Sequence, residues 1–130
     1  MFGKILYLLI LSCLCVSNAQ AHPFLKIETI PAPEGNWTYI PEGSGEMFIH
    51  VETAHAKKIK VWRVPTGTQQ WKNRKLVCEE SGYKDNWNCV WRYDKDETIH
   101  DHFVVQVFGE GWEIQDSINV TRRHAEDHPQ

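Results

Sequence analysis

The sequence predicts a small all-β domain, and three features point to that fold class. After residue 21 the chain contains nine Val, eight Ile and seven Thr but only two leucines, Leu25 and Leu76. β-Branched side chains suit pleated sheets, whereas helices bury mostly Leu, Ala and Met. Short apolar or alternating segments recur roughly every ten residues, and Gly, Pro, Asn and Asp separate them. These features argue against a helical bundle.

The first 21 residues are expected to form an export signal that precedes this domain. A positive residue near the start is followed by an apolar run over residues 5–16, which is too short to span a bilayer. Small residues ending at Ala21 match a signal-peptidase site. Cleavage there would leave residues 22–122 as one domain and residues 123–130 as a polar tail.

The location of the chain follows from this signal, with two alternatives. Residues Ile10–Cys13 loosely resemble a lipobox, in which Cys13 would be lipidated and would anchor the chain. No later segment is apolar enough to insert in a membrane. We therefore expect a secreted or extracellular protein, with a lipid anchor through Cys13 or a periplasmic location as the alternatives.

The first three expected strands are delimited by proline and by alternation. The first stops at Pro31, where a loop rich in Pro and Gly begins. The second alternates cleanly, with Met47, Ile49 and Val51 on one face and polar side chains on the other. The third stops at Pro65. These strands cover residues 24–30, 46–53 and 58–64.

Four further strands complete the set. The fourth and fifth carry Cys78 and Cys89, and turn-forming Ser-Gly and Asp-Asn pairs lie between them. We therefore expect a hairpin that places the two cysteines opposite each other. The sixth strand has Phe103, Val105 and Val107 on one side. These four strands cover residues 74–79, 87–93, 103–108 and 114–121.

Seven short strands with turns between them predict an immunoglobulin-like β-sandwich, with a small Greek-key barrel as the alternative. Trp62 or Trp91 would suit the centre of its core. Cys78 and Cys89 form an even pair in an exported chain, which is typical of a disulfide. Closing a loop of this length contributes about 2–4 kcal/mol to stability.

Charge and motifs argue against nucleic-acid binding and catalysis. Removal of the signal takes away Lys4, so 14 − 1 = 13 Lys and Arg face 17 Asp and Glu, a net charge of −4. That balance does not suit a phosphate backbone. The chain has no G-x-S-x-G elbow, phosphate-binding glycine loop or H-E-x-x-H motif. We therefore expect a non-enzymatic protein, with no cofactor unless copper is bound.

One candidate metal site involves the expected mature N-terminus. A free amine and an imidazole at His22 would chelate Cu(II). His100, Asp101 and His102 stand at the start of a strand, where alternation sends the two imidazoles to one face and the carboxylate to the other. If the first strand begins beside them, His22 and one or more of these residues would form a copper site.

The N-terminal segment His22-Pro-Phe-Leu25 and residues 31–35 resemble the mature start of the periplasmic copper-resistance protein C family. This resemblance implies a small barrel of immunoglobulin-like topology that binds Cu(II) through the N-terminal histidine and a later Asp-x-His. Here the order is His100-Asp-His102, so only His22 carries over directly. The family's methionine-rich loop is absent, because Met47 is the only methionine after the signal.

A second resemblance covers more of the chain. Residues 61–68, 71–76, 100–107 and 118–120 are similar to an immunoglobulin-like domain of secreted Gram-positive bacterial proteins. That domain commonly stands as an accessory module, so the resemblance implies a non-catalytic extracellular role. It also implies a structural role for residues 100–102 as polar residues entering a strand.

The tryptophans suggest a different kind of site. Trp37, Trp71 and Trp112 lie in polar, loop-like stretches. Exposed tryptophans stack on sugar rings or fill a partner's pocket, so these three form a candidate surface for an unknown extracellular or cell-wall ligand. The alternative is that each caps an open end of the core. Asn36 and Asn119 begin N-glycosylation sequons, whose use depends on the host.

Overall fold

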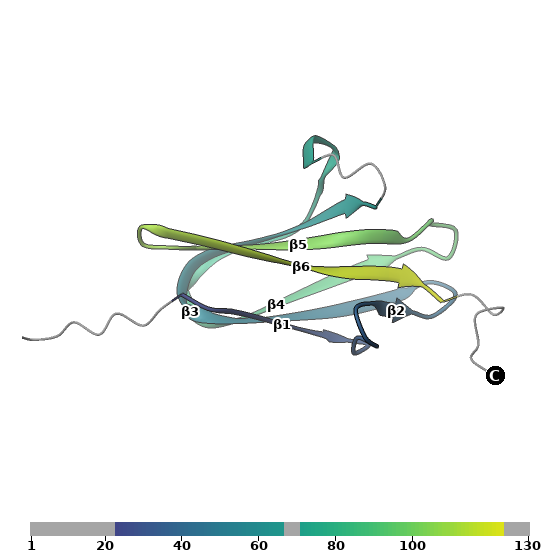
Figure 1. Cartoon of the computed structure of the whole chain (residues 1–130), viewed down its shortest axis with the longest axis horizontal. Coiled ribbons are helices and arrows are strands. Elements are labelled where there is room, and N and C mark those ends of the chain that lie inside the picture. The colour runs from purple at the N-terminus through teal and green to yellow at the C-terminus, as the bar shows by residue number, and fades with distance from the viewer. Residues whose placement is uncertain (1–22, 67–70, 124–130) are drawn as a thin grey trace, which may run out of the picture.

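Two long bent strands, β3 (Gly45–Pro65) and β4 (Lys75–Tyr93), organise the fold. In the computed structural model, which describes residues 23–66 and 71–123, they form an antiparallel ribbon that folds back on itself (Figure 1). The short 3-10 turn η2 (Trp71–Asn73) lies between them. The prediction of an all-β chain is confirmed, and the remaining strands are β1 (Leu25–Ile30), β2 (Thr38–Ile40), β5 (His100–Gly109) and β6 (Trp112–Arg122).

The ribbon bends where its backbone departs from regular pairing. His55 in β3 has a φ of 43° and Gly82 in β4 has a φ of 144°. The register between the two strands shifts twice between Glu52 and Lys58. Bulges of this kind bend a strand and increase its twist. The bend therefore sends the two halves of each strand into different layers.

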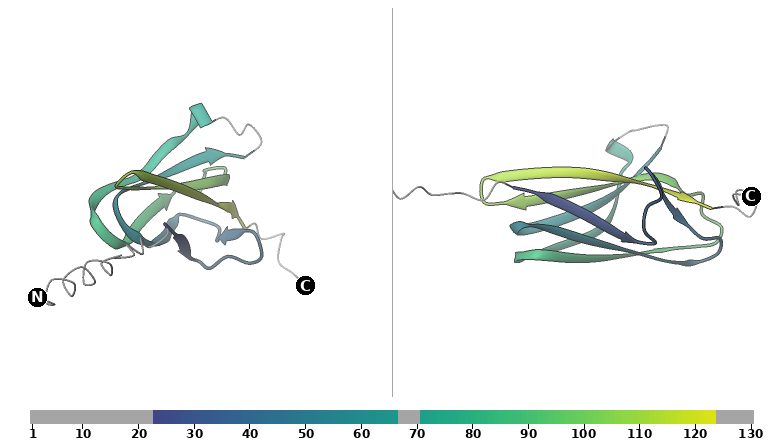
Figure 2. Two further views of the ribbon diagram at one scale, coloured as in Figure 1. Left: turned by 60° about the vertical axis from the view of Figure 1, so that its left-hand side comes forward. Right: turned by 60° about the horizontal axis from the view of Figure 1, so that its bottom comes forward.

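Each half of the ribbon belongs to one layer of a sandwich. The smaller layer contains β1, the first half of β3 and the second half of β4. The larger layer contains the first half of β4, the second half of β3, β5, β6 and β2 (Figure 2). β2 runs parallel to β6, and Thr38 Oγ1 in β2 lies 3.3 Å from Thr29 Oγ1 in β1. The single sheet is thus nearly closed as a barrel, which fits either a β-sandwich or a small barrel.

Inward-facing side chains from both layers fill the core. Phe103, Val105 and Val107 of β5 are all fully buried, as their alternation predicts. The ring of Trp91 lies 4.7 Å from that of Phe103, so Trp91 belongs to the core. Trp62 instead lies on the outer face of the larger layer, where it pairs with Val104.

The structure joins four of the predicted strands into two. The predicted strands at 46–53 and 58–64 are the two halves of β3. Those at 74–79 and 87–93 both fall in β4, which begins one residue later than predicted, at Lys75. The alternation breaks at each bend, so the local pattern predicts an end where the strand continues. Strand β2 was not predicted, because its three residues are ordered by pairing with the distant β6.

The Cys78–Cys89 disulfide is confirmed, but the predicted hairpin is wrong. Both cysteines lie in β4, where they pair with Val61 and Ile49 of β3. Their Cα atoms are 6.1 Å apart at a sequence separation of 11, whereas a straight strand of that length spans about 36 Å. The disulfide therefore joins the two halves of one folded strand, across the core.

The disulfide suits an oxidising, extracellular setting. The predicted signal and its cleavage site, together with most of the polar tail, lie outside the described residues. Within residues 23–66 and 71–123, no helix has the length and hydrophobicity needed to cross a bilayer.

Candidate functional site

The predicted His-Asp-His motif lies where β5 begins, at one end of the sandwich. His100 and His102 face outward, and Asp101 faces inward with 4% exposure, as strand alternation predicts. The three side chains therefore have different surroundings, and they do not converge on one point.

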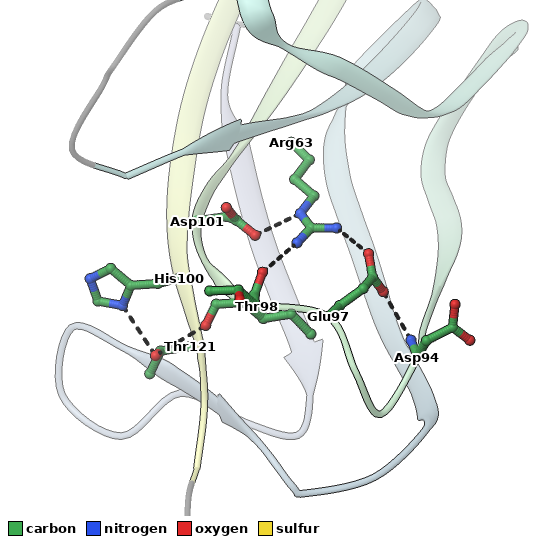
Figure 3. A network of polar contacts seen from close by, with 8 residues as sticks. Arg63, Asp94, Glu97, Thr98, His100, Asp101 and Thr121 are labelled. Carbon is green, nitrogen blue, oxygen red and sulfur yellow. Dashed lines mark hydrogen bonds and ion pairs between the residues drawn. The ribbon is translucent and has the colours of Figure 1, made fainter.

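Asp101 is the buried member of a partly buried polar network (Figure 3). Arg63 Nε donates to Asp101 Oδ2 at 2.6 Å, and Arg63 Nη1 donates to Glu97 Oε1 at 2.9 Å. Arg63 Nη2 also donates to the carbonyl oxygen of Thr98 at 3.1 Å. Because the Arg63 guanidinium lies 5.0 Å from the ring of Trp91, this network closes one end of the core. The carboxylate of Asp101 is thus committed to a structural ion pair.

Glu97 gives this network a pH dependence. The backbone N–H of Asp94 and the side chain of Arg63 both donate to its carboxylate, and they lower its pKa from the ordinary value of 4.5. A carboxyl whose pKa is lowered by folding stabilises the protein above its unfolded pKa, and this stabilisation is lost as the pH falls through the folded pKa.

Replacing Glu97 with Gln should therefore flatten the acid side of the stability profile. We expect E97Q to be less stable than wild type at pH 6 and to lose less stability between pH 6 and pH 3. Urea unfolding midpoints at both values measure this change. If both proteins lose the same amount of stability between pH 6 and pH 3, Glu97 does not contribute to acid sensitivity.

The two histidines are held by neighbours on the outer surface. The ring of His100 stacks on Trp37, with centroids 4.7 Å apart and an interplanar angle of 15°. His102 Nδ1 donates to Asn119 Oδ1, and Asn119 Nδ2 donates to the backbone oxygen of Asn36 at 3.1 Å. Both imidazoles thus have structural contacts.

The structure gives no support to the copper prediction. His22 lies outside the described residues, but β1 begins at Leu25, which pairs with Thr53 beside the bend of the ribbon. His102 pairs with Val64 near the far end of β3, so β1 and β5 begin at opposite ends of the sandwich (Figure 1). Among the described residues, no group of three or more His, Cys, Asp or Glu side chains is arranged to hold a metal ion.

The three candidate tryptophans do not share one surface. Trp37 and Trp71 lie near the end of the sandwich where β5 begins, since they contact His100 and border His102 respectively. Trp112 lies at the opposite end, as the first residue of β6, where it packs over Gly109 and against the core. Trp112 therefore matches the core-capping alternative.

Trp71 borders a groove on the outer face of the larger layer, which we call the Trp71 groove. Side chains of β3, β5 and β6 form the rest of this groove, whose volume is about 270 Å³. Trp71 is 40% exposed. The residues that line the Trp71 groove are Val64, Trp71, His102, Val104, Ser117 and Asn119.

Trp71 is held in place by an arginine and a second tryptophan. The Arg74 guanidinium lies 4.6 Å from the ring of Trp71 and 4.5 Å from the ring of Trp62. The two indoles meet edge to face, with centroids 5.9 Å apart. Arg74 Nη1 also donates to the backbone oxygen of Trp71 at 3.0 Å. These contacts fix an exposed aromatic ring, which lowers the entropy cost of using it for binding.

The polar side of the Trp71 groove has a defined hydrogen-bonding pattern. Because Asn119 Nδ2 donates to a carbonyl, its Oδ1 faces His102 and accepts the Nδ1 proton. In the tautomer with the proton on Nδ1, the other ring nitrogen, Nε2, is the hydrogen-bond acceptor. The hydroxyl of Ser117, an exposed residue, adds a group that both donates and accepts.

Sequence reasoning identified Trp71 and His102 but did not bring them together. Alternation places His102 and Val104 on the outer face of β5, and that signal is visible in the sequence. The sequence carries no signal that the turn holding Trp71 lies beside β5 and β6. The supporting role of Arg74 was also missed.

Three larger hollows are less suited to a ligand. The one of about 360 Å³ is bordered by Arg63 and Asp101, which pair with each other. A polar hollow of about 640 Å³ is bordered by Arg122, which already donates to the carbonyl oxygens of Gly43 and Asp94. An apolar hollow of about 460 Å³ lies on the smaller layer beside His50, whose ring nitrogens face Asn88 and Asn86 at 2.8 and 3.2 Å. In all three hollows these polar groups are engaged within the protein.

Comparison with known proteins supports the fold alone. No family model matches the chain, and no curated protein matches it. One similar solved structure is the 1.98 Å crystal structure of an engineered protein from the Northeast Structural Genomics Consortium. It has a TM-score of 0.51 and 11% sequence identity, and the match covers 82% of this chain. The chain corresponds to only 21% of the length of that engineered protein.

Proposed function

We propose that this chain is an exported, non-catalytic binding module whose contact surface is the Trp71 groove. The observation that carries the proposal is an exposed indole held rigidly beside a groove by Arg74 and Trp62. Tryptophan is enriched among the residues that dominate binding energy, and rigid rings lose little entropy on binding. The partner is an extracellular or cell-wall component.

Export supports this role and is consistent with the disulfide. The apolar segment over residues 5–16 and the small residues ending at Ala21 predict secretion by a cleaved signal. The Cys78–Cys89 disulfide persists in the oxidising compartments that such signals lead to.

Replacing Trp71 with Ala should separate binding from folding. We expect W71A to bind pelleted cell-envelope material of the producing organism about 30-fold more weakly, because loss of a dominant contact costs about 2 kcal/mol or more. Its stability should fall by only about 1 kcal/mol, since part of the ring is already exposed. Sedimentation binding and urea unfolding measure the two effects.

Tyr83→Ala is the matched control. Tyr83 is 60% exposed and lies at the bend of the ribbon, away from the Trp71 groove. Y83A removes an exposed aromatic ring and should bind like wild type. If W71A binds the envelope material as tightly as wild type does, the proposed contact surface is refuted. If W71A is less stable but binds equally well, Trp71 serves the fold and not binding.

A further inference from the structure

We infer that the ligand of the Trp71 groove is a saccharide, of which one sugar ring stacks on Trp71. This inference rests on the proposed function and names its ligand class. Four features of the groove carry it: an apolar wall and floor, the charge beside the wall, the polar groups along one side, and the position of the groove on the sheet.

The apolar part of the Trp71 groove matches the C–H face of a pyranose ring. The wall is the indole of Trp71, and Val64 and Val104 contribute apolar surface from β3 and β5. A pyranose with equatorial substituents presents a flat apolar face and a polar rim. Stacking this face on an aromatic ring buries apolar surface, which favours binding. The volume of about 270 Å³ lies just below the range of roughly 300–1,000 Å³ for drug-sized ligands, which suits one ring.

The positive charge of Arg74, beside the indole of Trp71, argues against a cationic ligand. The guanidinium of Arg74 already lies 4.6 Å from the ring of Trp71. A second cation on the same indole, such as a lysine side chain or a quaternary ammonium group, would be repelled by Arg74. A neutral or anionic sugar meets no such penalty.

The polar groups of the Trp71 groove match hydroxyls. His102 Nε2 accepts, and the Ser117 hydroxyl both donates and accepts. The ring of His102 is oriented by Asn119, which is itself anchored on the backbone oxygen of Asn36. A sugar rim carries neighbouring groups that donate and accept, so it satisfies both partners.

The position of the groove on the sheet disfavours an extended peptide. Peptides that add to a sheet pair with the free backbone groups of an edge strand. The Trp71 groove lies over β5, which is paired with β3 on one side and β6 on the other. Over β5, therefore, only side chains are offered to the ligand.

Binding to purified polysaccharides tests the inference. The probes are cellulose, chitin, xylan and peptidoglycan as particles, and the matching soluble hexasaccharides or muropeptides in calorimetry. We expect wild type to bind at least one of the four. W71A should bind at least 10-fold more weakly, whereas Trp71→Tyr, which keeps an aromatic ring, should stay within a few-fold of wild type. His102→Ala and Ser117→Ala should each weaken binding about 2- to 10-fold, as loss of one hydrogen bond predicts. Y83A should be unchanged.

Protease treatment of the envelope material separates this inference from the proposed function. If the Trp71-dependent retention survives digestion with proteinase K, a saccharide ligand is supported. If digestion abolishes it, the ligand is a protein, so the saccharide inference falls while the binding function stands. If wild type binds none of the four polysaccharides, or if W71A binds one of them equally well, the saccharide inference is overturned. If undigested envelope material retains W71A as well as wild type, both the saccharide inference and the proposed binding function are overturned.

Discussion

Replacing Arg63 with Met is expected to lower the free energy of unfolding by about 3–5 kcal/mol, the range for breaking a buried ion pair from one side. The side chains of Arg63 and Asp101 are only 14% and 6% exposed. Methionine keeps much of the apolar stem, but it leaves the carboxylate of Asp101 buried without its partner. Urea unfolding at neutral pH measures the loss.

Two comparisons make this prediction specific to the buried charge. Arg92 forms an ion pair with Glu46 at 3.0 Å, but its side chain is 83% exposed, so R92M should cost less than about 1 kcal/mol. The double variant R63M/D101L removes both buried charges and should recover much of the loss. A cost for R63M as small as that of R92M would show that water screens the pair.

Removal of the disulfide is the second large effect. We expect C78A/C89A to lose about 2–4 kcal/mol of stability, because the bond restricts the unfolded chain. The loss should be accompanied by faster hydrogen exchange along both halves of β4, since the bond ties them together across the core. Urea unfolding and amide exchange report the two changes.

Reduction of the disulfide in wild type provides the control. Dithiothreitol should lower the unfolding midpoint of wild type to near that of C78A/C89A and should leave the midpoint of the variant unchanged. Equal midpoints for wild type and variant in the absence of reductant would show that the covalent link does not stabilise the protein.

The strands were predictable wherever burial follows a local period. Met47, Ile49 and Val51 alternate with polar residues, and the structure buries all three. The same is true of Phe103 and its neighbours in β5. Alternation is a property of a few consecutive residues, because each side chain of a strand points to the face opposite its neighbours. The number of strands was less predictable, since a bend interrupts alternation in the same way as a turn.

The disulfide was also predictable only in part. Its two cysteines could be paired from their number and from the expected compartment. Their placement in one folded strand could not, because it depends on β4 pairing with both halves of β3. A local turn and a bend of the whole ribbon bring the cysteines equally close, so the sequence between them does not distinguish the two.

Only part of the candidate site could be predicted from the sequence. Trp71 is visible as a tryptophan in a polar stretch, and the outward direction of His102 follows from alternation. The sequence also suggested Asp101 as a metal ligand, but Arg63, which lies 38 positions earlier in the chain, binds its carboxylate. Ionic partners at such separations leave no local pattern.

By itself, therefore, the sequence determined the fold class, the inward and outward faces of its strands and the pairing of its cysteines, all of which depend on composition and on neighbouring residues. The tertiary structure decided that β1 and β5 begin at opposite ends of the sandwich, that Asp101 is an internal ion-pair partner and that Trp71 stands beside His102 and Ser117. The physical reason is that these relations arise from pairing between distant strands, and the bend of one ribbon sets which residues meet.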